Sequence, residues 1–105
     1  MYATIGRYEG IDTSRTDEVG RSVNESLLPR LSELPGFGGY YLIEAGNGVM
    51  TSVTLFETSA QADESTHLVV DWVQEEELQK ALPKPPKITS GEVVARTMNG
   101  AAAAL

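Results

Sequence analysis

A histidine and an aspartate stand four residues apart in an acidic, helix-forming stretch of the chain. His67 is the only histidine in the sequence, and an imidazole, with an unperturbed pKa of about 6.5, is well suited to take up a proton near neutral pH. On a helix, Asp71 lies one turn after His67, so its carboxylate can accept a hydrogen bond from the imidazole and orient it. The pair therefore predicts a general base. The alternative is a solvated histidine on an acidic helix.

Other polar side chains border the predicted apolar surfaces. Asn24 lies one turn after Gly20, which leaves room beside it, so its amide could bind a substrate oxygen. The alternative is a helix-edge asparagine that hydrogen-bonds water. Arg7 and Arg96 could hold an anionic substrate, but ion pairs with nearby glutamates are the favoured interpretation. A metal site is not predicted, because a single histidine, scattered carboxylates and the absence of cysteine give no ligand spacing.

Length and composition indicate one globular domain. The chain has 105 residues, of which 41% are hydrophobic and 22% charged, and such a length is too short for two ordinary domains. We expect the domain to span residues 1–97, followed by a tail at 98–105 that forms a frayed end or a short helix.

The formal net charge of −7 predicts repulsion from phosphate backbones, so no nucleic-acid partner is expected. No segment approaches the roughly 20 apolar residues that span a bilayer, and the N-terminal residues do not have the pattern of a signal peptide. A cytoplasmic location, without a membrane partner, is the resulting prediction.

The first half of the chain reads as a strand followed by a helix. Tyr2–Tyr8 is rich in aromatic and β-branched residues, which favours a strand. Asp12 to Ser14 then offer capping side chains, and an apolar stripe from Val19 to Leu34 predicts a helix. Pro29 falls inside that stripe, and because proline lacks a backbone N–H it should kink the helix or divide it.

The second half reads as a hairpin, a helix and a strand. Strands at 38–45 and 49–57 flank an Asn-Gly turn, which is the strongest short hairpin signal. Thr58 to Gln61 match a capping box, and the helix that follows runs toward Leu82 with a bend near Glu75. Prolines then lead to a last strand at 88–97.

This order of elements predicts an α+β, ferredoxin-like βαββαβ fold, with a four-stranded antiparallel sheet and two helices on one face. Both faces of the central strands are apolar. Strict alternation places Phe37, Tyr41 and Ile43 on one face and Tyr40 and Leu42 on the other. Because a sheet that is apolar on both faces needs two covers, we expect a homodimer through the helix-free side of the sheet. The glycines at 38 and 39 predict a bulge where the second strand begins.

The stretch "LPRLSELPGFGGYYLIEAGNGVMTSVTLFET" combines an apolar helix end, a PGF-glycine-tyrosine run, a hairpin glycine and a strand that ends in Phe-Glu-Thr. This pattern resembles the antibiotic biosynthesis monooxygenase-like family of dimeric α+β barrels, and the resemblance covers Tyr2 to about Arg96. It implies that two subunits close their sheets into one barrel, and that each subunit has a pocket between its own sheet and helices. Members of the group include cofactor-free oxygenases of aromatic polyketides and quinols, and haem-degrading enzymes.

The resemblance implies roles for particular residues. Trp72 is similar in location to a tryptophan that lines the pocket in several members, and an indole can both stack on a ring and donate a hydrogen bond. The alternative is that Trp72 is a core residue. Haem degradation is disfavoured, because the first strand lacks the asparagine of those relatives and the sole histidine precedes Trp72.

The resulting hypothesis is a homodimeric, cofactor-independent monooxygenase of a small aromatic or quinol-like substrate. His67 and Trp72 are the predicted catalytic residues, and Tyr41, Asn24 and Asp71 the predicted substrate-binding residues. No cofactor and no metal are expected. The alternative is a non-catalytic dimeric barrel that binds a small hydrophobic ligand.

Overall fold

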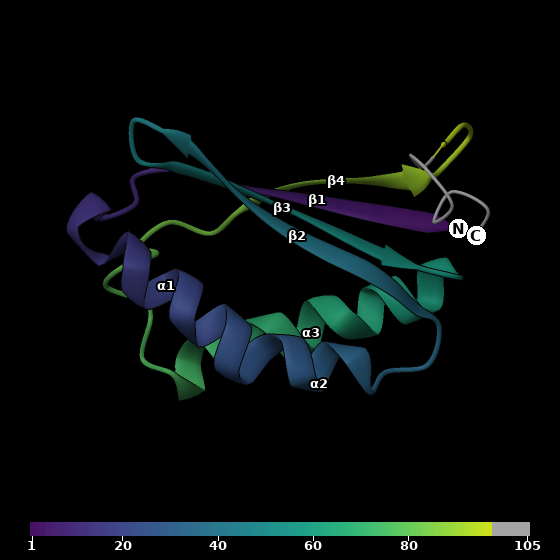
Figure 1. The fold of residues 1–105 in the computed structure, drawn as a ribbon, viewed down its shortest axis with the longest axis horizontal. Helices are drawn as coiled ribbons and strands as arrows, with labels where there is room; N and C mark the ends of the chain where they lie inside the picture. The colour runs from purple at the N-terminus through teal and green to yellow at the C-terminus, as the bar shows by residue number, and fades with distance from the viewer. Residues whose placement is uncertain (98–105) are drawn as a thin grey trace.

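The computed structural model describes residues 1–97, and the predicted tail at 98–105 lies outside them. Strands form one layer and helices pack on one face of it (Figure 1). The strands are β1 (Tyr2–Tyr8), β2 (Phe37–Gly46), β3 (Val49–Phe56) and β4 (Lys87–Glu92), and the main helices are α1 (Thr16–Ser22), α2 (Leu28–Ser32) and α3 (Ser59–Glu75).

The sheet has the order β2-β3-β1-β4, and all neighbouring strands are antiparallel. The ferredoxin-like α+β arrangement expected from the sequence is therefore confirmed. The hairpin between β2 and β3 turns through Asn47 (φ 55°) and Gly48 (φ 74°). Two successive positive φ angles match the twist of antiparallel strands, which is why Asn-Gly was a reliable signal.

A β-bulge at the start of β2 decides which side chains face the helices. The β2–β3 register shifts between Phe37 and Gly39, where Gly39 has φ 154°. Strict alternation placed Phe37 on the face of Tyr41, and that prediction was wrong. The extra residue turns Phe37 toward the helices, where its ring meets Phe56 edge to face at a centroid distance of 5.7 Å. The bulge itself was predicted from the glycines.

Pro29 interrupts the regular α-helical pattern, as expected from the sequence, but the chain continues in the same direction. Residues Val23–Leu27 form a π-helical segment between α1 and α2, and the Leu28 N–H donates to the Val23 carbonyl. Because Pro29 cannot donate to the residue four positions earlier, the wider turn accommodates the missing bond.

Two of the predicted element boundaries were wrong. α3 begins at the capping box of Thr58 and Gln61, as predicted, but ends at Glu75 rather than near Leu82. Glu77 adopts φ 56°, and the Leu78 N–H donates to the Val73 carbonyl, which ends the helix. β4 ends at Glu92, short of the predicted position 97.

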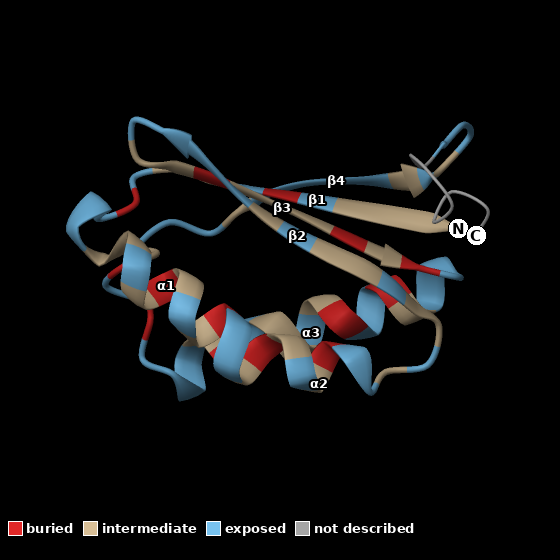
Figure 2. Cartoon of the chain, viewed as in Figure 1, coloured by how far each residue is buried: buried red, intermediate tan, exposed pale blue. Residues whose placement is uncertain are grey.

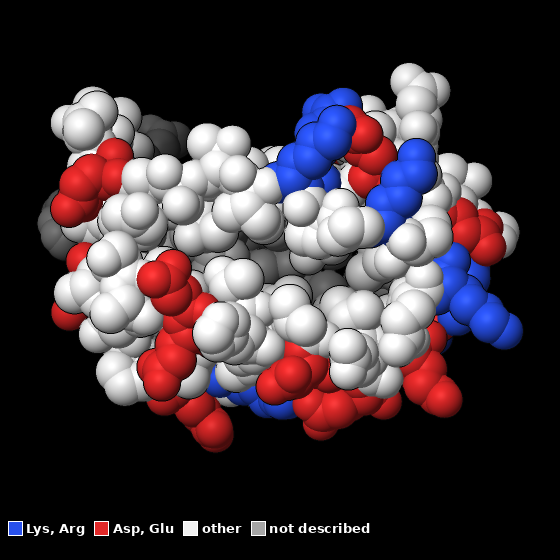
Figure 3. Space-filling view, turned by 180° about the vertical axis from the view of Figure 1, so that it is seen from behind, with Lys and Arg blue, Asp and Glu red and all other residues white. Residues whose placement is uncertain are grey.

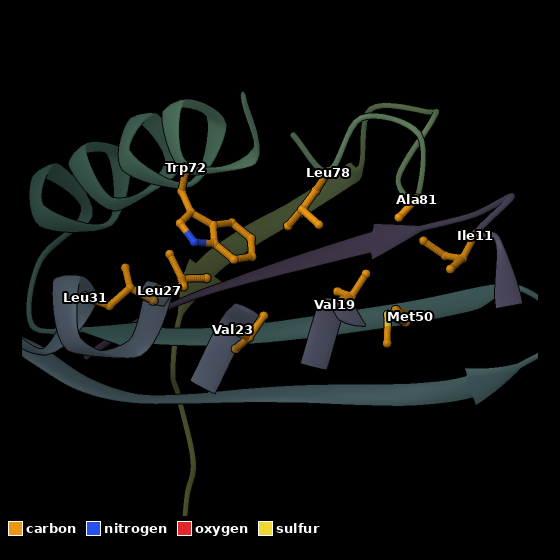
Figure 4. Packing of buried hydrophobic residues seen from close by; sticks show 9 residues of the cluster. All are labelled: Ile11, Val19, Val23, Leu27, Leu31, Met50, Trp72, Leu78 and Ala81. Carbon is orange, nitrogen blue, oxygen red and sulfur yellow. The ribbon is translucent and has the colours of Figure 1, made fainter. Parts of the chain in front are cut away.

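The core lies between the sheet and the helices, where the buried residues gather (Figure 2). Trp72 reaches from α3 into this layer beside Leu27 (Figure 4). Its indole Nε1 donates to Ser26 Oγ at 3.1 Å. Ser26 belongs to the π-helical segment, so this hydrogen bond ties α3 to the interrupted helix.

Candidate functional site

A cavity of about 360 Å³ opens between the β1–β4 half of the sheet and α3. In Figure 3 the surface is hollowed between the sheet and the helix layer. Basic side chains gather on the sheet side of this hollow, and acidic side chains gather on the helix side. The volume is in the range of small-molecule sites, which are typically 300–1,000 Å³.

Small side chains of the central strands form the floor of the cavity. β1 and β3 pair so that Thr4 faces Thr54 and Gly6 faces Ser52, and all four residues line the cavity. A Cβ at Gly6 would lie 3.0 Å from Ser52 Oγ. The space therefore exists because these four helix-facing positions hold small side chains or, at Gly6, none.

The wall opposite the floor comes from α3. Val69, Val70 and Val73 line the cavity, and Ser65 and Thr66 line it one turn earlier. Both of these hydroxyls donate to the Ala62 carbonyl, at 2.7 Å from Ser65 and 3.2 Å from Thr66. Because each hydroxyl proton is used within the helix, both groups face the cavity as acceptors.

Part of the segment between α3 and β4 borders the remaining side of the cavity. We call residues 79–86 the strap. Gln79 and Leu82 line the cavity, as do the consecutive residues 83–86, Pro-Lys-Pro-Pro. Proline fixes φ and restricts the residue before it. The strap therefore has few backbone conformations available and holds its side chains in place.

Two tyrosines keep their phenolic protons at neutral pH. Burial raises the pKa of Tyr8, which lines the cavity. Burial also raises the pKa of Tyr40, and the proximity of Tyr8 raises it further. Tyr8 can therefore serve the cavity as a neutral hydrogen-bond donor.

His67 and Asp71 lie on an exposed face of α3 and do not line the cavity. No hydrogen bond or ion pair joins their side chains among those found within residues 1–97, so the expected orientation of the imidazole is not observed. The residues of α3 that do line the cavity include Thr66 and Val70, the immediate neighbours of His67 and Asp71 in the sequence. The role of His67 as a base stays a prediction.

Trp72 is 2% exposed and lies in the core rather than along the cavity. Its neighbours in the hydrophobic cluster include Leu27 and Leu31, on the α1–α2 side of the helix layer. The structure therefore gives the tryptophan a packing role, and a catalytic role stays a prediction.

Asn24 and Tyr41 are placed away from the cavity. The Asn24 amide donates to the Gly20 carbonyl at 3.1 Å, and its side chain borders a second, shallow groove beside Tyr40. Tyr41 is 61% exposed on the helix-free face of the sheet. The predicted site residues are thus spread over three surfaces, and their substrate contacts stay predictions.

Sequence reasoning missed the residues that build the cavity. The signal was present as small residues at the helix-facing positions of two central strands, Thr4 and Gly6 on β1 and Ser52 and Thr54 on β3. Because small residues also occur in ordinary strands, these positions did not by themselves indicate a cavity above the sheet.

The described residues contain no cluster of histidine, cysteine and carboxylate side chains that could hold a metal ion. Among the same residues, no helix is both long and apolar enough to span a bilayer.

The fold is shared with several solved structures. A monooxygenase from the ActVA-Orf6 gene of Streptomyces coelicolor, in complex with nanaomycin D, superposes with a TM-score of 0.74 and 10% identity, over 94% of this chain and 92% of that one. A protein of unknown function from Nitrosomonas europaea superposes with a TM-score of 0.71 and 18% identity, over 94% of each chain. A dimeric ferredoxin-like protein from an uncultured marine organism superposes with a TM-score of 0.69 and 15% identity, over 94% of this chain and 92% of that one.

Further structures with this fold carry the name antibiotic biosynthesis monooxygenase, in agreement with the resemblance noted from the sequence. No protein-family model matches the chain, and no curated protein matches its sequence. At these identities the comparisons show that the chain has the ferredoxin-like fold of those proteins.

Proposed function

We propose that the chain is a homodimeric, cofactor-independent monooxygenase of the antibiotic biosynthesis type, and that a small aromatic or quinol-like substrate binds in the cavity between the sheet and α3. The observation that carries the proposal is the cavity itself, with apolar walls of valine, leucine and proline and a few hydroxyl groups. Small-molecule sites typically combine apolar walls with a few placed polar groups. A monooxygenase with the same fold has been solved in complex with nanaomycin D, which supports a small-molecule ligand for the proposed enzyme.

The proposed oxygenation requires few protein groups. For an anthrone-type substrate the net reaction is R₂CH₂ + O₂ → R₂C=O + H₂O. The deprotonated substrate reduces O₂ by one electron, and the substrate radical and superoxide combine to a peroxide anion. This anion takes back the proton that the substrate lost and becomes a hydroperoxide. That hydroperoxide loses water to give the ketone. Apolar walls exclude bulk water from the reactive carbanion, and Tyr8 can donate a hydrogen bond to the substrate oxygen on which negative charge develops.

The proposed dimer uses the helix-free face of the sheet. Ile5, Tyr41 and Ile43 are 39%, 61% and 48% exposed there, and Val53 and Leu55 occupy neighbouring positions on β3. Contiguous apolar surface of this kind is typical of an interface. A solved ferredoxin-like protein with the same fold is described as dimeric, which supports a dimer without indicating its interface. A cytoplasmic location remains part of the proposal.

One observation favours the alternative function of a non-catalytic barrel that binds a hydrophobic ligand. Within residues 1–97, the side chains that line the cavity include no imidazole and no carboxylate, so the predicted base His67 is not beside the proposed substrate.

Oxygen uptake distinguishes the two functions. Purified protein, treated with EDTA and free of flavin, is mixed with dithranol, a dihydroxyanthrone, in an oxygen electrode, and anthraquinone formation is followed by chromatography. The proposed oxygenase should consume one O₂ per ketone formed, at a rate well above that of buffer alone. Tight dithranol binding without faster oxygen uptake would instead establish the ligand-binding barrel. An absence of both binding and turnover would exclude the cavity as a site for this class of compound.

A further inference from the structure

Among the described residues that line the cavity, Lys84 is the only one with a charged side chain. None of the ion pairs found within residues 1–97 involves it. By contrast, Arg7 and Lys87 on the nearby strands both pair with Glu9, at 2.8 and 3.4 Å. Although the protein is strongly acidic, the ammonium group of Lys84 at the cavity therefore forms no ion pair with a carboxylate of residues 1–97.

Prolines flank Lys84 in the strap. Lys84 precedes Pro85, which restricts its backbone conformation, and it follows Pro83, whose own φ is fixed. Its side chain passes over Gly10, where a Cβ would lie 3.2 Å from Lys84 Cε and 3.6 Å from Nζ. Gly10 follows closely after the end of β1, so the ammonium group lies near the Tyr8 end of the cavity.

The other end of the cavity offers only neutral hydroxyl groups. Thr4 and Thr54 face each other on the sheet, and Ser65 and Thr66 lie on α3. Thr4 to Tyr8 is four residues of strand, about 13 Å at roughly 3.3 Å per residue. Valines of α3 and Ile88 of β4 line the same cavity. The cavity is therefore elongated and apolar, with an ammonium group near one end and hydroxyl groups at the other.

We infer that the ligand of this cavity is a planar aromatic compound that carries a carboxylate, and that Lys84 binds the carboxylate. The inference rests on the proposed use of the cavity and names the class of substrate. A ring system of two or three fused rings would bind between the α3 valines and the floor at Gly6, and Thr4 and Thr54 would donate to a carbonyl or hydroxyl oxygen at the far end.

A pair of isosteric probes tests the role of Lys84. Anthracene-2-carboxylate and anthracene-2-carboxamide differ in charge but hardly in shape, and their fluorescence reports binding. We expect Lys84→Gln to weaken carboxylate binding about fivefold to tenfold, in line with loss of one charge-assisted contact that is partly open to solvent. Carboxamide binding should change less than about twofold. Raising the salt from 50 to 500 mM should reduce the wild-type preference for the carboxylate.

Lys80→Gln is the matched control, since Lys80 is an exposed lysine close in sequence that does not line the cavity. It should leave both affinities unchanged, and Lys84→Arg should keep the preference. Equal weakening of both probes by Lys84→Gln, or equal affinities of the wild type for both, would overturn the inference while leaving the cavity as a binding site. Failure of both probes to bind would refute the inference and the proposed function together.

Discussion

Adding one methyl group to the floor of the cavity tests whether the proposed substrate binds there. Gly6 is buried on the helix face of β1. An added Cβ would lie 3.0 Å from Ser52 Oγ, 3.5 Å from Ile88 Cδ1 and 3.6 Å from Tyr8 Cε1. The Gly6→Ala methyl group therefore occupies space that a flat ring would need, and the only tight contact is with a single hydroxyl oxygen.

The expected effects on stability and on binding differ in size. Replacing glycine by alanine at a compatible backbone position stabilises by about 0.4–1 kcal/mol through the unfolded chain, and the contact with Ser52 offsets part of that gain. The free energy of unfolding should thus change by less than about 1 kcal/mol. Misfit by one methyl group in an apolar pocket costs about 1–3 kcal/mol, so affinity for anthracene-2-carboxamide should fall about tenfold or more.

Gly91→Ala is the matched control, because Gly91 lies on β4 and its Cβ would meet no atom within 4 Å. It pairs with Ala3 on the opposite face of the sheet from Gly6. Affinities from fluorescence titration and unfolding free energies from urea denaturation are measured for the wild type and both variants. If Gly6→Ala binds the carboxamide as tightly as the wild type while remaining folded, the ring does not bind against this floor and the proposed location is wrong.

Three further predictions concern residues outside the cavity floor. His67→Ala tests the predicted general base. Loss of that base should lower oxygenase activity by about a hundredfold or more, whereas activity within about twofold of the wild type would show that the imidazole, which is exposed and does not line the cavity, has no catalytic role. Trp72→Phe should lower the free energy of unfolding by about 1–3 kcal/mol in urea titrations, since it removes buried volume and the 3.1 Å hydrogen bond to Ser26 Oγ, whereas unchanged stability would contradict the packing role. Tyr40 has a raised pKa in the folded chain, so its contribution to stability is present below the unfolded pKa of about 10 and is lost as pH rises above it. Tyr40→Phe should therefore lose less stability than the wild type between pH 9 and 11. An equally steep loss in the variant would contradict the raised pKa of Tyr40.

Local signals predicted the frame of the fold because each has a short-range physical cause. The capping box at Thr58 and Gln61 satisfies backbone donors of the same helix turn, and Asn47 and Gly48 adopt the positive φ angles that a tight hairpin needs. The face of Phe37 could not be obtained by alternation, because one extra residue in the bulge reverses the order of faces. The end of α3 was also missed. Leu78 and Ala81 lie off the apolar stripe of the helix, which was interpreted as a bend near Glu75, whereas α3 ends at Glu75 and both residues are buried after it.

The candidate site was harder to predict because a cavity is defined by volume that is missing. His67 and Trp72 were predicted as catalytic from their residue types, but His67 is exposed and Trp72 is buried in the core. On the β2 side of the sheet, Phe37 and Tyr40 pack against the hydrophobic core. On the β1 side, the helix-facing positions hold Thr4 and Gly6, which are too short to reach α3.

This asymmetry explains how one sheet can both stabilise the fold and leave room for a ligand. The helix layer must stay at a distance from the sheet that the large residues of β2 and the buried Trp72 set, because interiors are close-packed and resist compression. The same distance applies over β1, where small residues cannot fill it, so the hollow persists without a ligand. A cavity held open in this way needs no rearrangement to admit a rigid, flat molecule. Binding should therefore depend on shape at Gly6 and on charge at Lys84 as two separable contributions, and the effects of Gly6→Ala and Lys84→Gln on the affinity for anthracene-2-carboxylate should add in the double variant.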